Sequence, residues 1–241
     1  CPSANNPRAT IDAVAMNVIS PAEQQALYER SPHNVVRIEY GVRRESDTES
    51  DSRYTRAAAD LARWRAEGVL ALDDRPAIYG YRQEFAWAGE RYTRQAWFAA
   101  LRLEEWEKGV VKPHEHTLAN PKADRMSLLR ATRTQISPVY SLFRERAPSD
   151  TKIPDGEPLF DFEADGQRHV LSAITGGRGV AAFQTMLAAS DVYIADGHHR
   201  YETALAYRDE VRARAASWTV MDRETRKRAA KRFMDPPVIL R

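Results

Sequence analysis

The sequence contains one cysteine, no long apolar run and no excess of charge of one sign. Because Cys1 stands alone, an internal disulfide framework and a zinc site built from several cysteines are excluded. This cysteine usage fits a reducing compartment, and we expect the cytoplasm. No stretch approaches the ~18 consecutive apolar residues of a membrane span, and the N-terminus has no basic-then-apolar signal. We therefore expect no membrane partner.

The charges are nearly balanced. Lysine and arginine total 36 and aspartate and glutamate total 34, which leaves a formal net charge of +2. Proteins that bind nucleic acid concentrate basic charge on one face or stripe. The one crowded basic stretch, 223–232, is typical of a solvated helix face. Nucleic acid is therefore not an expected partner. The 241 residues are enough for a buried core in one large or two small domains.

Periodicity and turn residues predict a mixture of helices and strands. Ser20 and Glu23 form the signature of a capped helix start. The dipeptides Ala88-Gly89 and Asp165-Gly166 each lie between two partly alternating apolar segments, which is typical of β-hairpins. The expected elements are a helix over 21–30, a strand over 35–40, a loop over 43–53, a helix from 54 that ends at Gly68, a hairpin over 77–103, a helix over 122–132, a strand over 139–143, a hairpin over 159–174, a helix over 179–189, a strand over 192–195 and a helix over 201–214.

The strongest chemical signal is the pentapeptide Asp196-Gly197-His198-His199-Arg200, which joins a predicted strand to a predicted helix. Such a junction directs unpaired backbone N–H groups and the positive end of a helix dipole to one point, which favours phosphate. The glycine allows a close approach, and the arginine can add a forked contact. The carboxylate would repel phosphate unless it holds a cation or receives a proton from an attacking hydroxyl. The alternative is an aspartate N-cap with locally bonded histidines.

A second cluster is His114-Glu115-His116, followed by Lys122 and Arg125. A glutamate between two histidines can act as a general base, and the two cations can neutralise phosphate charge. The alternative is a loop whose polar residues cap the next helix. The four histidines of the two clusters could instead gather around a transition metal, although neither cluster has the H-E-x-x-H spacing.

Two phrases, KPHEHTLANPKADRMSLLRAT and YIADGHHRYETALAYRDE, resemble the signatures of domain-of-unknown-function family 1015. A looser similarity covers most of residues 17–208 in the family's order. Family members usually carry an aromatic residue and an aspartate before Val-Ile-Ser, where this chain has Ala15-Met16-Asn17. They also usually run well beyond the last helix, which suggests that this chain is a fragment.

That family in turn resembles the ParB and sulfiredoxin superfamily, whose members bind nucleotide phosphates on a strand-turn-helix motif, and especially its free-serine kinases. By this resemblance Glu115 corresponds to the glutamate that deprotonates serine. Asp196 corresponds to an essential aspartate, and 197–200 to the phosphate-binding turn. Sulfiredoxin has a cysteine in its turn and this chain has none there, so repair of an oxidised cysteine is not expected. We see no helix-turn-helix of the kind that DNA binding would use.

The expected function is transfer of the terminal phosphoryl group of ATP or ADP, with Mg²⁺, to the hydroxyl of a small metabolite, serine being the first candidate. Glu115 would be the base, Asp196 would orient the hydroxyl or hold Mg²⁺, and 197–200 would hold the phosphates. Lys122 and Arg125 are expected as further phosphate or substrate contacts, and His114 and His116 as supporting residues. Two alternatives stay open: a nucleotide-binding switch that recruits a protein partner, and a histidine-rich metal hydrolase.

The expected fold is α/β (α+β), with a mixed, partly barrel-like sheet and a ParB/sulfiredoxin-like strand-turn-helix site. Residues 1–70 would form an N-terminal layer of helices and strands in the same domain. Residues 71–241 would form the nucleotide-binding core, and 148–158 is the best internal linker. No pattern indicates an oligomeric state.

Overall fold

The chain is divided into two compact units. The computed structural model describes residues 19–114, 119–145, 153, 155–218 and 238–239. Of these, unit 1 contains 19–72, 119–137, 206–218 and 238–239, and unit 2 contains 73–114, 138–145, 153 and 155–205. Each unit has its own hydrophobic core.

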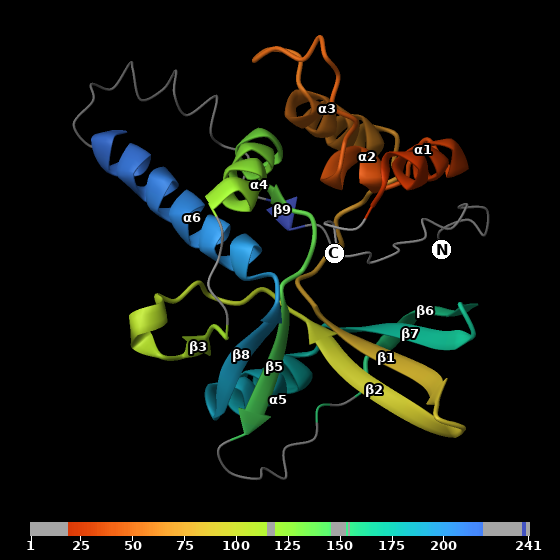
Figure 1. Ribbon diagram of the computed structural model, residues 1–241. Coiled ribbons are helices and arrows are strands. Elements are labelled where there is room, and N and C mark those ends of the chain that lie inside the picture. Colours follow the sequence, from red (N-terminus) through yellow and green to blue (C-terminus); the bar gives the residue numbers. More distant parts are fainter. Residues whose placement is uncertain (1–18, 115–118, 146–152, 154, 219–237, 240–241) are drawn as a thin grey trace. The chain divides into compact units, whose positions relative to one another are not determined.

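Unit 1 is mainly helical (Figure 1). Its core is made by Ile38, Ala57, Leu61, Trp64 and Leu128, which come from three different helices. Two short strands pair in parallel. The elements are α1 (Pro21–Arg30), α2 (Val36–Glu39), α3 (Arg53–Ala66), α4 (Ala119–Thr132), β4 (Thr134–Gln135), β9 (Val238–Ile239) and the later part of α6 (His198–Trp218).

Helix α1 has the predicted ends, and α3 begins one residue earlier than predicted, at Arg53, and is terminated at Gly68 as predicted. The backbone N–H of Ser20 donates to the Glu23 carboxylate at 2.8 Å, and the backbone N–H of Glu23 donates to Ser20 Oγ at 3.2 Å. These reciprocal bonds satisfy two groups at the start of α1. After α3, Gly68 has a φ of +72°, and the backbone N–H of Val69 donates to the Trp64 carbonyl at 2.8 Å. This left-handed turn ends the helix.

The strand predicted over 35–40 is wrong. These residues contain α2, in which Val36 and Ile38 are both buried. The Asn34 side chain accepts a hydrogen bond from the backbone N–H of Val36 at 3.1 Å, which helps to start a helical turn. An apolar run this short does not show enough of a repeat to distinguish a buried strand from one turn of helix.

Unit 2 contains two open sheets (Figure 1). The antiparallel sheet has the order β2-β1-β7-β6 and is made of β1 (Ile78–Trp87), β2 (Glu90–Phe98), β6 (Glu157–Ala164) and β7 (Gln167–Ile174). The mixed sheet has the order β3-β8-β5 and is made of β3 (Val111–Lys112), β5 (Tyr140–Glu145) and β8 (Ser190–Asp196). In it β3 is parallel and β5 antiparallel to β8. The unit also contains η1 (Trp106–Lys108), α5 (Gly177–Ala188) and the first part of α6.

Both predicted hairpins are confirmed. Ala88 and Gly89 have φ values of 52° and 83°, and Asp165 and Gly166 have values of 51° and 72°. Two successive positive φ values define the turn type that matches the twist of a two-residue hairpin. The second arm of the first hairpin ends at Phe98 rather than continuing to 103.

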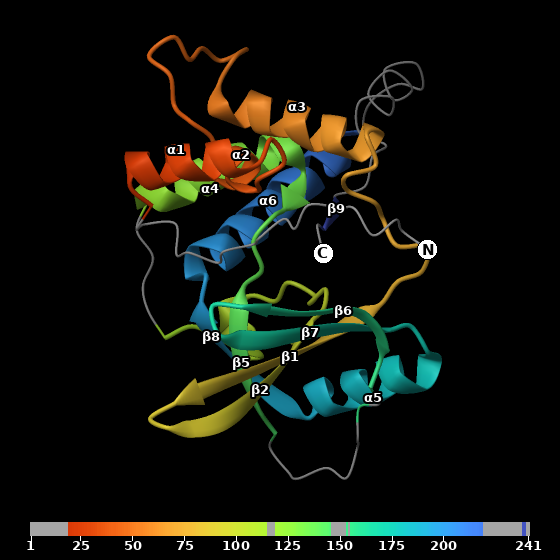
Figure 2. The same ribbon diagram turned by 90° about the vertical axis from the view of Figure 1, so that its right-hand side faces the viewer.

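Helix α5 supports both sheets of unit 2. It packs on β5 and β8 (Figure 2). Its Phe183 and Met186 side chains also join Ile78 and Ile174 of the antiparallel sheet in one buried cluster. A second cluster, which includes Val111, Ile194 and Tyr201, lies between the mixed sheet and the start of α6.

The mixed α/β class is confirmed, and the remaining predicted helices and strands are present with shifted ends. In the part of the chain that the structure describes, each sheet stays open, so the expected barrel-like closure is not found. The predicted linker 148–158 lies mostly outside the described residues. None of the described helices has the length and apolar character that a membrane crossing would require.

Candidate functional site

The turn between β8 and α6 brings a glycine and an arginine together. Gly197 has a φ of +97°, and the first helical hydrogen bond runs from the backbone N–H of Tyr201 to the Gly197 carbonyl at 3.0 Å. Gly197 is thus the N-cap of α6. A Cβ atom at position 197 would lie 2.8 Å from Nε of Arg200. The guanidinium therefore lies against the turn, in space that only glycine leaves open.

Arg200 is held in this place by Asp196. Its Nη2 atom donates to Oδ2 of Asp196 at 2.5 Å. The Arg200 side chain is 21% exposed, whereas that of Asp196 is 69% exposed. The guanidinium charge and the positive end of the α6 dipole consequently act at the same point, with one solvated carboxylate beside them. An arriving phosphate can replace that carboxylate on the guanidinium.

His114 connects the two histidine-containing segments. Its backbone N–H donates to Nε2 of His198 at 3.2 Å, and its Nδ1 lies 2.6 Å from the carbonyl oxygen of Ile194. Because a carbonyl only accepts, the proton of His114 is on Nδ1, and Nε2 of His198 acts as the acceptor. The two rings meet edge to face at 4.5 Å. His198 is only 1% exposed, so the imidazole that accepts this hydrogen bond is buried.

The parallel pairing of β3 with β8 explains why these segments meet. Val111 pairs with Val192 and Lys112 with Tyr193, so the chain after β3 reaches the same end of the sheet as the chain after β8. The carboxyl ends of parallel strands share one edge of a sheet, and ligands bind there in open α/β sheets. His114 is two residues beyond β3.

Two residues near the turn were not predicted as part of the site. The Tyr201 hydroxyl donates to the carbonyl of Glu104 at 2.8 Å and accepts from its backbone N–H at 3.0 Å, while its ring lies 4.7 Å from that of Trp106. This fixes the first turn of α6.

Tyr140 of β5 pairs directly with Asp196, next to a β-bulge, and is 45% exposed. The strand pattern identified Tyr140 only as a strand residue, because its partner depends on a distant pairing.

Lys122 and Arg125 lie on α4, which belongs to unit 1. Arg125 contacts Glu39 at 3.1 Å and Asp124 at 2.6 Å. Burial alone would raise the pKa of Asp124, but hydrogen bonds from Tyr54 and Arg125 lower it below its ordinary value. The guanidinium of Arg125 is therefore part of an ion-pair network within unit 1.

Glu115 and His116 lie outside the described residues, and His199 is half-buried at the start of α6. Among the residues that are described, no group of three or more His, Cys, Asp or Glu side chains could hold a metal ion. Mg²⁺ makes a different demand, since it usually binds one or two carboxylates together with substrate phosphates and water. The exposed carboxylate of Asp196 fits that requirement.

A family model described as "Protein of unknown function (DUF1015)" matches residues 3–234. The chain therefore belongs to this family, as the resemblance predicted. Neither the curated proteins nor the solved structures gave a match. The more distant resemblance to the ParB and sulfiredoxin superfamily stays a prediction.

Proposed function

We propose that the protein is a Mg²⁺-dependent phosphotransferase that transfers the terminal phosphoryl group of ATP or ADP to a hydroxyl of a small metabolite, with serine as the first candidate. The observation that carries this proposal is the convergence of Gly197, Arg200 and the N-terminus of α6 at the end of β8. The resemblance to ParB and sulfiredoxin proteins implies nucleotide phosphates at such a strand-turn-helix site.

Phosphate binding uses three features of the turn. The first N–H groups of a helix have no carbonyl partner within the helix, so they point outward at its end. The glycine lets phosphate oxygens approach the backbone. Arg200 adds a charged fork that is already held in position by Asp196. Mg²⁺ bound to the phosphates would use Asp196 as its protein ligand.

Glu115 is the proposed base because it follows His114, which two hydrogen bonds fasten to Ile194 and His198. In the proposed reaction Glu115 takes the hydroxyl proton of the acceptor. The acceptor oxygen bonds to the terminal phosphorus while the bond from that phosphorus to the bridging oxygen breaks. The nucleotide leaves as ADP or AMP, whose charge Mg²⁺ would balance when bound. Tyr140 offers an exposed ring beside Asp196 on which the nucleobase of the nucleotide can stack.

The test is a product assay with ATP or ADP, Mg²⁺ and a panel of hydroxylated amino acids. We expect release of ADP or AMP that depends on the acceptor, with an equal amount of phosphorylated acceptor. Glu115→Gln should leave nucleotide binding near normal and lower turnover about 10²- to 10⁴-fold. Unchanged turnover in this variant would remove Glu115 from the role of base.

The alternative function is a nucleotide-binding switch that recruits a protein partner. The ion pair between Asp196 and Arg200 favours it, since the pair must open when phosphate takes its place and so provides two states of one turn. A switch binds nucleotide without acceptor-dependent product. Nucleotide binding combined with no phosphorylated acceptor from the whole panel would favour the switch over the kinase.

A further inference from the structure

The antiparallel sheet of unit 2 has two unlike faces beyond its buried end. On one face Arg82 contacts Glu84 at 2.9 Å, and Arg168 contacts Glu84 at 3.7 Å and Asp161 at 2.7 Å. The register places these four residues on the same side, since Glu84 pairs with Arg168 and both Arg82 and Asp161 pair with Val170. This face has the charged surface expected of a sheet in contact with water.

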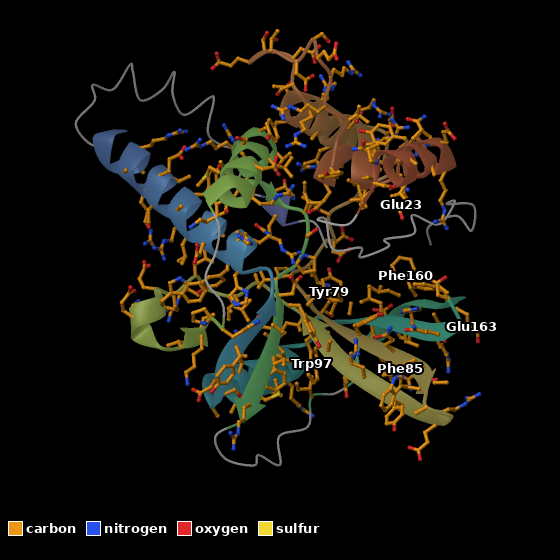
Figure 3. The ribbon with its side chains drawn as sticks, viewed as in Figure 1. Glu23, Tyr79, Phe85, Trp97, Phe160 and Glu163 are labelled. Atoms are coloured by element: carbon orange, nitrogen blue, oxygen red, sulfur yellow. The ribbon has the colours of Figure 1, made fainter. Side chains whose placement is uncertain are left out.

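The other face is aromatic. Cross-strand pairs place Phe85 opposite Tyr92 and Phe162 opposite His169. Trp87 and Phe160 are 68% and 61% exposed. Figure 3 shows Phe85 and Phe160 on the two hairpins. We call this surface the aromatic face, and it is formed mainly by Phe85, Trp87, Tyr92, Phe98, Phe160 and Phe162.

This surface is too large to be an incidental exposure of single side chains. Large aromatic residues bury about 150–250 Å² each, and five of the six are exposed by 39–68%. Together they leave on the order of 500 Å² of aromatic surface, within the range of the largest patches on monomers, which often mark binding sites. The same strands carry ion pairs on their opposite face. The difference between the two faces therefore comes from the alternation of aromatic and charged residues along each strand.

The ring geometry favours a protein surface as the partner. The rings of Phe162 and His169 stack at 17° and those of Phe85 and Tyr92 at 26°. In these two pairs the rings cover one another's faces and present their edges outward, whereas nucleobases and sugars need free ring faces. Edges and the gaps between them fit interdigitating apolar side chains, as between two packed sheets.

Charge on this face points to a second copy of the same chain. Glu90 and Arg94 lie on the same side of β2, two residues before and two residues after Tyr92. Besides these two, the Asp, Glu, Lys and Arg residues of the described strands put only Glu157, at the far end of β6, on this side of the sheet. The basic concentration that nucleic acid needs is therefore missing from this face. A two-fold axis that lies in the interface, runs across the strands and passes Tyr92 sets residue 90 of each copy opposite residue 94 of the other.

We propose that the aromatic face is the interface of a homodimer, in which two antiparallel sheets pack face to face about this axis. Each copy then supplies the same patch, as an isologous interface requires. The aromatic surface, on the order of 500 Å², would supply more than half of the ~800 Å² per partner of a standard interface. Glu90 of each copy faces Arg94 of the other, so both charges are paired across the interface. The dimer is independent of the phosphate site, and failure of either proposal leaves the other standing.

The test is sedimentation velocity over a range of concentrations, with three charge variants of the full chain and one mixture of two of them. Wild-type protein is expected to be dimeric. Glu90→Arg and Arg94→Glu each place like charges opposite one another and should raise the dimer Kd at least about tenfold. The double variant Glu90→Arg/Arg94→Glu should restore the dimer. An equimolar mixture of the two single variants should also restore it, because one copy then carries two arginines and the other two glutamates.

Two further variants separate this face from the rest of the surface. Phe160→Ser should weaken the dimer, and Arg168→Ser, on the charged face of the same sheet, should leave the dimer Kd unchanged. Circular dichroism checks that each variant is folded. Wild-type protein that stays monomeric at every concentration overturns the proposal. A dimer whose Kd is the same in wild-type protein and in the charge variants at positions 90 and 94 also overturns the proposal, because such a dimer must use another surface.

Discussion

Gly197 and Arg200 depend on each other. The glycine has a positive φ and leaves the space that the guanidinium occupies, and Asp196 holds the guanidinium there. This arrangement involves three residues within one turn of chain, so the strand-to-helix turn at the pentapeptide could be predicted from the sequence. The contact between Gly197 and Arg200 could not, because it depends on the rotamer of the arginine.

Gly197→Ala should displace Arg200 and weaken the binding of pyrophosphate about tenfold or more. The new Cβ would lie 2.8 Å from Nε of Arg200, and a positive φ costs a non-glycine residue roughly 1–2 kcal/mol. Gly89→Ala is the matched control, since Gly89 also has a positive φ and a Cβ there would meet nothing within 4 Å. Both variants should lose similar stability in urea unfolding. Equal pyrophosphate affinity for both variants would contradict the role assigned to the turn.

Asp124→Asn should make the free energy of unfolding less dependent on pH in the acidic range. The pKa of Asp124 is lowered in the folded state, so its ionised form stabilises the fold above the ordinary aspartate pKa of about 3.9, and this contribution is lost as the pH falls through the lowered value. At neutral pH the variant should lose about 1–3 kcal/mol of unfolding free energy. The difference from wild type should shrink as the pH falls below about 4.

Asp60→Asn is the control for this experiment. Asp60 forms a surface ion pair with Arg63 at 2.8 Å within α3. Such pairs contribute about 0–1 kcal/mol, so this variant should follow the wild-type pH profile closely. A constant difference between Asp124→Asn and wild type from pH 7 to pH 2 would show that the carboxylate's charge is not what stabilises unit 1.

Helices and hairpins were predictable where the signal is local. The capping box of α1 and the two glycine-containing hairpin turns each lie within a few residues, and all three were identified. Helix α6 begins at His198 rather than at 201, because the positive φ of Gly197 lets the strand turn directly into the helix. Sheet order was not predictable, since β1 pairs with β7 across a long stretch of chain. For the same reason the sequence did not place Tyr140 beside Asp196.

Tyr201→Phe should loosen the first turn of α6. It removes a hydroxyl that bonds both the carbonyl and the N–H of Glu104. The loss is expected to be about 1–3 kcal/mol, because two buried backbone groups lose their partner. Hydrogen exchange of the amides at 201–205 should become faster. Tyr207→Phe, on the same helix but in unit 1, is the control. Unchanged exchange in Tyr201→Phe would show that the Trp106 contact alone holds the turn.

At the scale of the whole molecule, composition excluded classes of protein without naming a function. The nearly balanced charge argued against nucleic acid, and the resemblance supplied the family, which the match over 3–234 confirms. The division of the described residues into two units could not be seen in the sequence, because unit 1 is assembled from separate segments of the chain. Lys122 and Arg125 belong to unit 1, and residues 196–200 of the turn belong to unit 2.

The most direct test of the central claim is calorimetric titration with ATP, ADP, CTP and GTP in the presence of Mg²⁺. Wild-type protein, Asp196→Ala and Arg200→Ala would be compared. The claim that the turn holds nucleotide phosphates predicts binding of at least one nucleotide, weakened about 10- to 100-fold in Arg200→Ala by the loss of a charged hydrogen bond worth about 1.5–3 kcal/mol. Asp196→Ala should bind nucleotide more weakly than wild-type protein when Mg²⁺ is present. Without Mg²⁺ its affinity should not be lower than that of wild-type protein. No binding by wild-type protein, or binding that Arg200→Ala leaves unchanged, would contradict the claim.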